Sequence, residues 1–148
     1  SALFDRGFDR MLLDWIAQSR RFLGICVGHQ FMATHSDEGS CPCLGAVDQK
    51  VIDMRSKCKD VKIPHMGWNQ LEPRQDSALL KHINSGDYAY FVHSYAAPIS
   101  EATIAASSYG AKFTAVTRKD NVMGCQFHPE RSSRVGAQIF KNFLELEL

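Results

Sequence analysis

A cysteine between two glycines, in the run Gly24-Ile25-Cys26-Val27-Gly28, is the first stretch of the sequence that could carry out chemistry. Its spacing is that of a nucleophile elbow, a strained strand-to-helix turn in which glycines leave room for the backbone. Such a turn lifts the sulfur out of the sheet and directs a helix N-terminus at it, which favours the thiolate. The backbone N–H of Val27 is then placed to stabilise an oxyanion. A buried structural cysteine between incidental glycines is the alternative that this pattern leaves open.

A second stretch, Gln126-Phe127-His128-Pro129-Glu130, supplies the acid–base groups that a catalytic cysteine needs. His128 can take the proton of a thiol and return it to a leaving group. Residues two apart in an extended segment point the same way, so the Glu130 carboxylate can hold the imidazole in one tautomer. Alone, the stretch could be a turn with a surface His and Glu. Together with the elbow, it predicts Cys26 as nucleophile, supported by His128 and Glu130.

The elements that must position these residues follow from the apolar pattern. The helices expected are 8–19, 27–33 and 133–146, with a short one at 78–83. The apolar face expected for the first helix is Met11, Leu12, Trp15 and Ile16, and that expected for the last is Val135, Ile139, Phe140 and Phe143. The strands expected are 22–26, 47–54, 61–63, 88–93, 103–107, 114–117 and 122–127, with an irregular stretch at 64–69 and a polar loop at 36–45. The run 22–26 is apolar on both faces, which suits a buried parallel strand. We therefore expect a single α/β domain over residues 1–148, with antiparallel strands late in the chain.

Composition narrows the classes of partner. The chain has 148 residues, with 17 Lys plus Arg and 16 Asp plus Glu, so a net charge of +1 gives no reason to expect a nucleic acid or a membrane. No apolar run is long enough to span a bilayer, and no signal peptide is visible. Five cysteines, an odd number with irregular spacing, favour a reducing, cytoplasmic setting. Cys41-Pro42-Cys43 lacks zinc-site spacing, so we expect an ordinary loop and no metal or cofactor.

The other histidines carry weaker signals. His29, His35, His65 and His82 are scattered, without metal-ligand spacing, and structural or surface roles are expected for them. His93 lies at the end of a predicted strand, where a role in ligand binding and a structural role are equally open.

The two motifs, extended to Phe22-Leu23-Gly24-Ile25-Cys26-Val27-Gly28-His29-Gln30, together resemble the class I glutamine amidotransferases. Two more stretches, Pro64-His65-Met66-Gly67-Trp68-Asn69 and Tyr90-Phe91-Val92-His93-Ser94-Tyr95, resemble the glutaminase subunits of imidazole glycerol phosphate synthases. The resemblance runs from about Gly7 to Leu148. It implies a flavodoxin-like fold with a mostly parallel central sheet and helices on both faces.

The resemblance also implies an activity. Glutamine would be hydrolysed to glutamate and ammonia through a thioester on Cys26, without a cofactor. The ammonia would pass to a (β/α)₈-barrel cyclase subunit that makes imidazole glycerol phosphate in histidine biosynthesis. The matching positions implied to hold glutamine are Gln30, Glu38, Ser94 and Tyr95. Those implied to lie at the cyclase interface are Met66, Trp68 and Arg131.

The chain departs from the family pattern in two respects. The family opens with a strand–helix–strand–helix that carries a second oxyanion donor, and the resemblance begins after it, so we expect an N-terminally truncated glutaminase domain. An inactive interaction module is one alternative that follows. His29 stands where this subfamily more often has Met or Leu, which leaves open another class I glutaminase, such as that of anthranilate synthase. A cysteine protease is a weaker alternative, because nothing indicates a peptide-binding groove.

Overall fold

The predicted elbow lies at the end of an edge strand of the main described sheet. The computed structural model of the protein describes residues 7–147, except for the side chains of Ser40 and Cys41. Strand β1 (Phe22–Ile25) leads through Cys26 directly into helix α3 (Val27–Phe31). β1 pairs in parallel with β11 (Val122–Cys125), as the apolar run predicted, but the expected burial is wrong, because only Gly24 of β1 is buried. The strand–turn–helix unit expected from the sequence is therefore confirmed.

The main sheet is mixed. Its strand order is β1-β11-β10-β9-β6, with β10 at Lys112–Lys119, β9 at Thr103–Ser108 and β6 at Glu72–Pro73. Among these described strands only β1 and β11 are parallel, and the other neighbours are antiparallel. The predicted α/β class is confirmed, but a mostly parallel sheet is wrong for the described strands. The reason is that short turns join β9 to β10 and β10 to β11, and strands joined by a tight turn must run antiparallel.

Two smaller sheets complete the described strands. One has the order β3-β2-β4-β8, from Cys41–Pro42, His35–Ser36, Lys50–Asp53 and Tyr95–Ala96. The other is an antiparallel ribbon of β5 (His65–Gln70) and β7 (Tyr88–His93). The stretch 64–69, predicted to be irregular, is thus mostly strand, whereas 61–63 is not a strand. Pairing with β7 made a strand of a segment whose proline and glycine indicated a turn.

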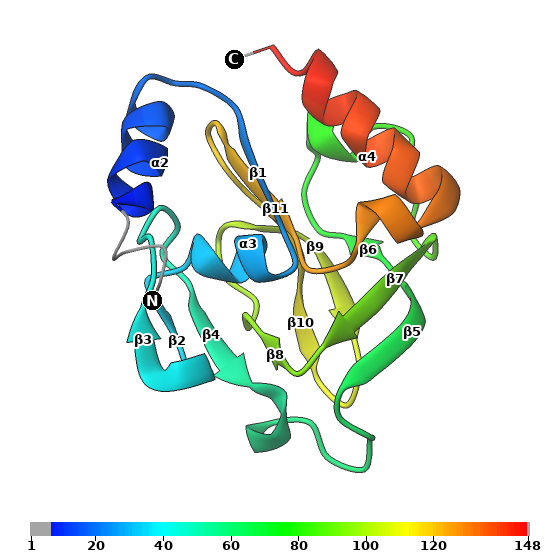
Figure 1. Cartoon of the computed structure of the whole chain (residues 1–148). Helices are drawn as coiled ribbons and strands as arrows, with labels where there is room; N and C mark the ends of the chain where they lie inside the picture. Colours follow the sequence, from blue (N-terminus) through cyan, green and yellow to red (C-terminus); the bar gives the residue numbers. More distant parts are fainter. Residues whose placement is uncertain (1–6, 148) are drawn as a thin grey trace.

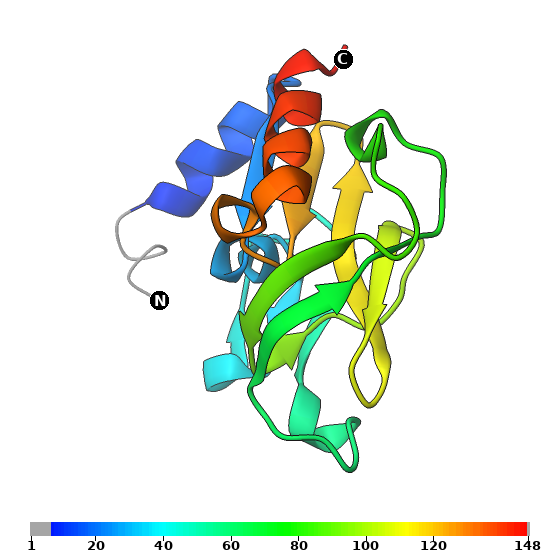
Figure 2. The same cartoon turned by 90° about the vertical axis from the view of Figure 1, so that its right-hand side faces the viewer.

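Helices lie on both sides of the main sheet. Val122 belongs to a core cluster with Met32 and Val47, whereas Met123 and Cys125 belong to the larger cluster beneath α4 (Ser133–Glu145). This alternation is the period of two expected of a strand. Figures 1 and 2 show α3 and α4 flanking β1 and β11, with the ribbon β5–β7 beside β9 of the main sheet. Short 3₁₀ turns lie at Glu38–Ser40, Met54–Ser56, Ala78–Leu80 and Pro129–Arg131.

Helix α4 is held by both apolar and polar contacts. Val135 and Ile139 are buried on its inner face, as the sequence predicted. Asn142 is also buried, and its amide donates to the carbonyls of Leu79 and Lys81 at 2.8 Å each. The amide satisfies two carbonyls at the end of the turn Ala78–Leu80, which ties that turn to the helix.

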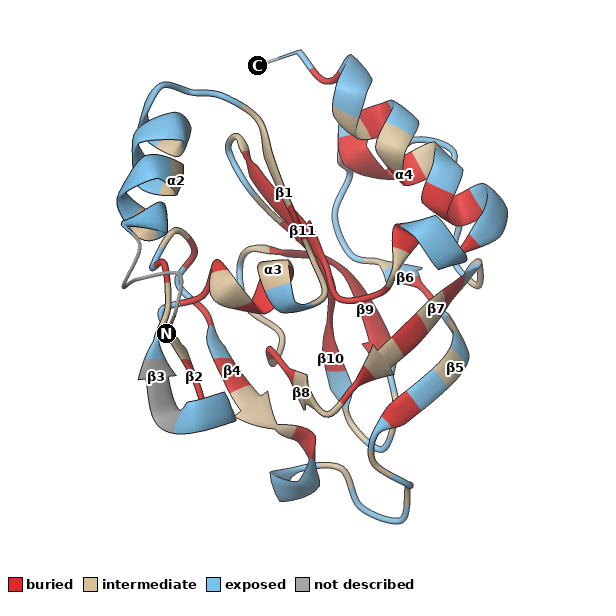
Figure 3. Ribbon diagram, viewed as in Figure 1, coloured by how far each residue is buried: buried red, intermediate tan, exposed pale blue. Residues whose placement is uncertain are grey.

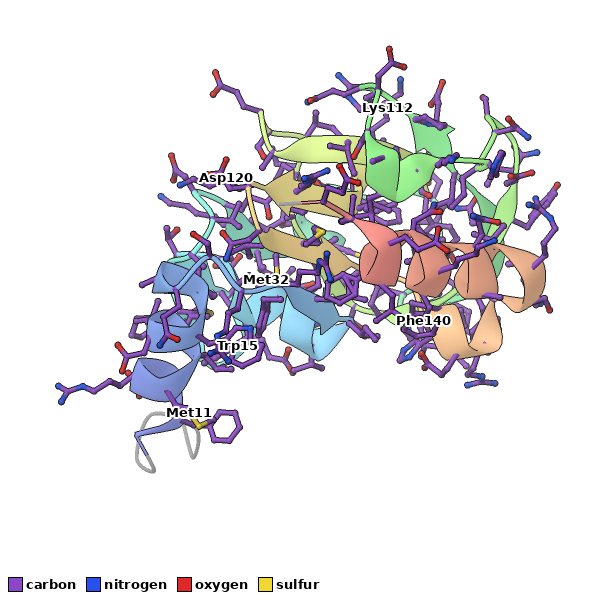
Figure 4. The ribbon with its side chains drawn as sticks, turned by 90° about the horizontal axis from the view of Figure 1, so that it is seen from above. Met11, Trp15, Met32, Lys112, Asp120 and Phe140 are labelled. Carbon is purple, nitrogen blue, oxygen red and sulfur yellow. The ribbon has the colours of Figure 1, made fainter. Side chains whose placement is uncertain are left out.

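The apolar face of helix α2 (Phe8–Ala17) is more exposed to solvent than the sequence pattern predicted. The apolar face was expected to include Met11, Leu12, Trp15 and Ile16, but only Leu12 and Ile16 are half-buried. Met11 is 54% exposed and Trp15 42%. In Figure 3, α2 is coloured mostly as exposed, whereas β9 and β11 are coloured mostly as buried. Figure 4 shows Met11 on the side of α2 away from the main sheet. The C-terminal end of α2 is anchored instead by Asn121, whose amide donates to the Ile16 carbonyl at 2.9 Å.

His29 is a core residue, so of the structural and surface roles that the sequence left open, it has the structural one. Its ring lies on β11, where a Cβ added to Gly124 would approach His29 Cδ2 to 2.6 Å. Its Nε2 is 2.8 Å from Thr117 Oγ1, and its Nδ1 is buried without a partner among the described residues. Because burial penalises the charged imidazolium, the pKa of His29 is lowered to about 4.

The low pKa of His29 predicts acid sensitivity. In the unfolded chain the imidazole takes a proton near pH 6.5, but the folded protein resists this until about pH 4. Stability is therefore present above pH 6.5 and is lost as the pH falls toward 4, by roughly 3 kcal/mol for this residue. His29→Leu should flatten the fall in the free energy of unfolding between pH 7 and pH 4.5, measured by urea denaturation.

The matched control for this prediction is His82→Asn. His82 is exposed and has a positive φ of 65°, which asparagine tolerates. This variant should keep the full pH dependence. His65 and His93 also have pKa values lowered to about 4, so part of the slope should remain in His29→Leu. Parallel curves for wild type and His29→Leu would contradict the prediction.

Candidate active site

Cys26 has a strained backbone at the junction of β1 and α3. Its φ is 52° and its ψ −102°, a combination that costs a residue with a side chain about 1–3 kcal/mol. The Cys26 N–H donates to the Cys125 carbonyl at 2.8 Å, and the Cys26 carbonyl accepts from the Gln30 N–H at 3.0 Å. Both bonds hold the turn in place, as expected of an elbow that presents a nucleophile.

The sulfur of Cys26 has two polar neighbours. The thiol lies 3.8 Å from the Val92 carbonyl, which can accept a hydrogen bond from it, and Gln126 Nε2 lies 3.7 Å from Sγ. Burial raises the pKa of the thiol, and the charges of Glu130 and Glu38 raise it further. The Val27 N–H and the Gln126 amide act in the opposite direction.

The Val27 N–H at the start of the helix lowers the pKa of the thiol, as expected of a helix N-terminus, but this effect is smaller than that of burial. Helix α3 has only five residues, and desolvation of the sulfur outweighs the nearby N–H groups. A thiol of this kind needs a base to remove its proton before it can attack.

His128 and Glu130 form the pair that the sequence predicted. His128 Nδ1 lies 2.6 Å from Glu130 Oε1. The carboxylate accepts from Nδ1–H, which leaves Nε2 as the nitrogen able to take a proton. The main chain of His128 is also fixed, because its N–H donates to the Tyr90 carbonyl at 2.9 Å and its carbonyl accepts from Ser132 Oγ at 2.6 Å. The Glu130 charge acts on Cys26, so the three side chains share one electrostatic site.

The residues predicted to hold glutamine lie around this site. Gln30 is buried, and its amide nitrogen donates to the Tyr95 carbonyl at 2.9 Å and to Gln126 Oε1 at 3.1 Å. Glu38 begins a 3₁₀ turn, and its charge acts on Cys26. Ser94 joins β7 to β8, and its carbonyl accepts from the Met54 N–H. A role of these four residues in binding glutamine stays a prediction.

The residues predicted for the partner interface gather on the outer face of the β5–β7 ribbon. Met66 is 63% exposed and Trp68 52%. Trp68 packs edge-on against Tyr90, its cross-strand partner, with ring centroids 5.9 Å apart. The Arg131 guanidinium lies 4.3 Å from the centroid of the same tyrosine ring. The structure thus brings Trp68 and Arg131 together through Tyr90, beside the Tyr90 carbonyl that holds His128.

Two neighbours of the nucleophile were missed by sequence reasoning. Gln126 was part of the motif but was given no role, although its place two residues before His128 was a usable signal. The Val92 carbonyl had no such signal, because a backbone acceptor can be contributed by any residue type. No group of three or more His, Cys, Asp or Glu able to hold a metal occurs within residues 7–147, and Cys41 lies outside the described side chains. No helix of the described chain is long and apolar enough to cross a membrane.

One known protein family matches nearly the whole sequence. The sequence model described as "Glutamine amidotransferase class-I" matches residues 5–146. The chain belongs to this family. Its amidotransferase elbow and its His128–Glu130 pair both lie within the matched range.

Curated relatives of the chain have a more specific description than the family. The chain is 54% identical over 125 residues to the imidazole glycerol phosphate synthase subunit HisH of Pectobacterium atrosepticum, covering 84% of this chain and 63% of that protein. It is 46% identical to the HisH subunit of Xylella fastidiosa, covering 84% of this chain and 62% of that protein. The chain therefore spans less than two thirds of the length of these curated relatives.

Solved structures have a similar fold. A crystal structure of a glutamine amidotransferase aligns with a TM-score of 0.69 at 17% identity, covering 97% of this chain and 69% of that one. Another glutamine amidotransferase, from Thermotoga maritima, aligns with a TM-score of 0.60 at 18% identity, covering 96% and 53%. At these identities the likeness concerns the fold alone.

Proposed function

We propose that the protein is a glutaminase, acting in the cytoplasm, that hydrolyses glutamine to glutamate and ammonia for an imidazole glycerol phosphate synthase. The observation that carries the proposal is the strained Cys26, with Gln126 at its sulfur and a His128–Glu130 pair whose Nε2 is available as a base. Family membership and the similarity to HisH subunits support glutamine as the substrate and a cyclase as the partner.

The proposed reaction has two halves. His128 Nε2 takes the Cys26 proton, and the thiolate attacks Cδ of the glutamine carboxamide, forming a carbon–sulfur bond and an oxyanion. The Val27 N–H would donate to that oxyanion. The bond between Cδ and the amide nitrogen then breaks as His128 returns the proton, so ammonia leaves and a thioester remains.

Water completes the proposed cycle. It attacks the thioester carbonyl and gives its proton to His128, the carbon–sulfur bond breaks, and glutamate leaves as the sulfur regains a proton. The balance is one glutamine and one water consumed for one glutamate and one ammonia. Gln30, Glu38, Ser94 and Tyr95 would hold the substrate.

The partner half of the proposal rests on the outer face of the β5–β7 ribbon. Its exposed Met66 and Trp68 are large apolar side chains of the kind that anchor protein interfaces. Tyr90 and Val92 lie on the neighbouring strand β7, and their carbonyls accept from the His128 N–H and the Cys26 thiol. A (β/α)₈-barrel cyclase docked on this face would receive ammonia close to where it forms.

Another class I glutaminase is less well supported. The feature that favoured it was His29, but this side chain is buried against Gly124 and Thr117. It is 2% exposed, so it does not lie on a surface that a substrate or a partner would contact.

The test of the proposal is ammonia release from glutamine by the 148-residue chain, first alone and then with the cyclase and the cyclase ligand. A parallel readout is covalent labelling of the Cys26 peptide by an electrophilic glutamine analogue, followed by mass spectrometry. Release together with labelling supports the proposal. A folded chain that shows neither in either condition would be an inactive module, and the proposed activity would be wrong.

Trp68→Ala is expected to weaken binding to the cyclase by roughly 30-fold, the effect of losing an aromatic anchor worth about 2 kcal/mol. The binding constant can be measured by titration calorimetry. Leu144→Ala is the control, because Leu144 is 70% exposed on α4, away from the ribbon. Equal affinities for the two variants would contradict the proposed interface.

A further inference from the structure

Two buried histidines touch beneath the β5–β7 ribbon. His65 and His93 face each other across the two strands and are 2% and 6% exposed. His65 Nδ1 lies 3.0 Å from His93 Nε2. A contact between two imidazole nitrogens is a hydrogen bond only if one of them carries a proton and the other does not.

The partners at each end fix which nitrogen carries the proton. His93 Nδ1 lies 3.0 Å from the Tyr95 carbonyl, which can only accept, so Nδ1 of His93 is the protonated nitrogen. Its Nε2 must then accept from His65 Nδ1–H. This leaves His65 Nε2 as an acceptor, and the Asn69 amide nitrogen lies 3.3 Å from it. The hydrogen bonds that join Asn69, the two histidines and the Tyr95 carbonyl therefore all run in one direction, from Asn69 to that carbonyl.

Both rings are neutral in this arrangement. Burial lowers the pKa of each to about 4, and for His65 the neighbouring His93 lowers it further. The hydrogen bond to the Tyr95 carbonyl raises the pKa of His93, whereas the charge of His128 lowers it. At neutral pH the pair is thus a fixed chain of dipoles and carries no charge.

The Tyr95 carbonyl accepts from two sides, so it joins the histidines to a second set of hydrogen bonds that reaches the nucleophile. The Tyr95 carbonyl also accepts from Gln30 Nε2 at 2.9 Å, and the same nitrogen donates to Gln126 Oε1 at 3.1 Å. With its oxygen occupied by Gln30, the Gln126 amide must turn its nitrogen away, and this nitrogen lies 3.7 Å from Cys26 Sγ. Each amide orientation is therefore set by its neighbour in the chain.

We propose that His65, His93, Gln30 and Gln126 form a positioning network that holds an amide N–H of Gln126 against the Cys26 sulfur. The network begins on β5, whose outer face carries Met66 and Trp68, and ends at the nucleophile. Its role in hydrolysis rests on the proposed glutaminase function. Its effect on the sulfur itself does not, because an N–H directed at sulfur favours the thiolate whatever the substrate.

The test is the pH dependence of Cys26 alkylation by iodoacetamide, followed on the Cys26 peptide by mass spectrometry. Gln126→Leu removes the N–H and should lower the alkylation rate near pH 8 by about fivefold, the factor for a hydrogen bond worth about 1 kcal/mol. The alkylation profile should move to higher pH. The charges of Glu130 and Glu38 also act on this thiol and are left unchanged by the substitution.

His93→Leu should shift the same profile in the same direction by a smaller amount, because Gln126 remains but is less firmly oriented. His93→Asn, whose amide can still donate to the Tyr95 carbonyl, should restore part of the rate. Thr103→Val is the control. It removes the buried hydrogen bond between Thr103 Oγ1 and Thr114 Oγ1, 2.8 Å apart, which is not part of the network. It should lower stability and leave the alkylation profile unchanged.

A second measurement uses the unmodified protein, in case the variants fail to fold. Nitrogen-15 NMR should show protonated Nδ1 and unprotonated Nε2 on both His65 and His93. Observation of the opposite tautomer on either ring would overturn the network. So would folded Gln126→Leu and His93→Leu proteins with the wild-type alkylation profile.

The outcomes separate this inference from the proposed function. If alkylation follows the network but glutamine is not hydrolysed, the network stands and the glutaminase proposal fails. If hydrolysis depends on Cys26 while the variants alkylate and turn over like wild type, the glutaminase stands and the network fails.

Discussion

Replacement of Cys26 by alanine is expected to abolish ammonia release from glutamine, with a loss of about 10⁶-fold, comparable to removing the nucleophile of another catalytic triad. The reason is that no neighbouring group can form the thioester in its place. Cys125, the adjacent cysteine of β11, is buried, and its pKa is raised far above the usual range of a thiol. Ammonia release measured with saturating glutamine, with and without the cyclase, is the readout.

The control for this experiment is Cys58→Ala. Cys58 is half-buried and packs at the edge of the core, away from the elbow. Its loss should leave ammonia release unchanged, so that any effect of Cys26→Ala is assigned to the nucleophile and not to thiols in general. Retention of glutaminase activity in Cys26→Ala would disprove the thioester mechanism.

Gly24→Ala is expected to destabilise the protein by at least about 3 kcal/mol, at the upper end of the usual cost of overpacking. A Cβ at this position would lie 2.5 Å from the Gly28 carbonyl oxygen and 2.8 Å from the His29 nitrogen. Both are backbone atoms of α3, so no rotation of a side chain can relieve the clash. Helix α3 would have to move away from β1, which displaces the elbow between them. The free energy of unfolding from urea denaturation measures the effect.

Gly28→Ala is the matched control. A Cβ at Gly28 meets nothing within 4 Å, and the residue lies inside α3. Alanine costs less than glycine in a helix, by up to about 1 kcal/mol, so this variant should be neutral or more stable. Both substitutions add the same methyl group, at positions on either side of the elbow. Similar stabilities would show that the close approach of β1 and α3 does not constrain the elbow.

Local sequence patterns determined the elbow and the acid–base pair. The run that ends at Cys26 is apolar and then glycine-bounded, and His128 and Glu130 are two residues apart, so each unit is specified within a few positions. The structure places both as expected. The same locality explains the confirmed amphipathic pattern of α4, whose buried Val135 and Ile139 are four residues apart.

Only the tertiary structure decided which distant segments meet. Strand β5 exists because residues 65–70 pair with 88–93, and nothing within that segment specified its partner. The pKa of Cys26 is set by burial and by Glu130 and Glu38, which come from other parts of the chain. The contact between His65 and His93, and the Gln126 amide at the sulfur, likewise join positions far apart in sequence. Spacing along the chain specifies a turn or a helix face, whereas desolvation and hydrogen-bond direction depend on neighbours that folding brings together.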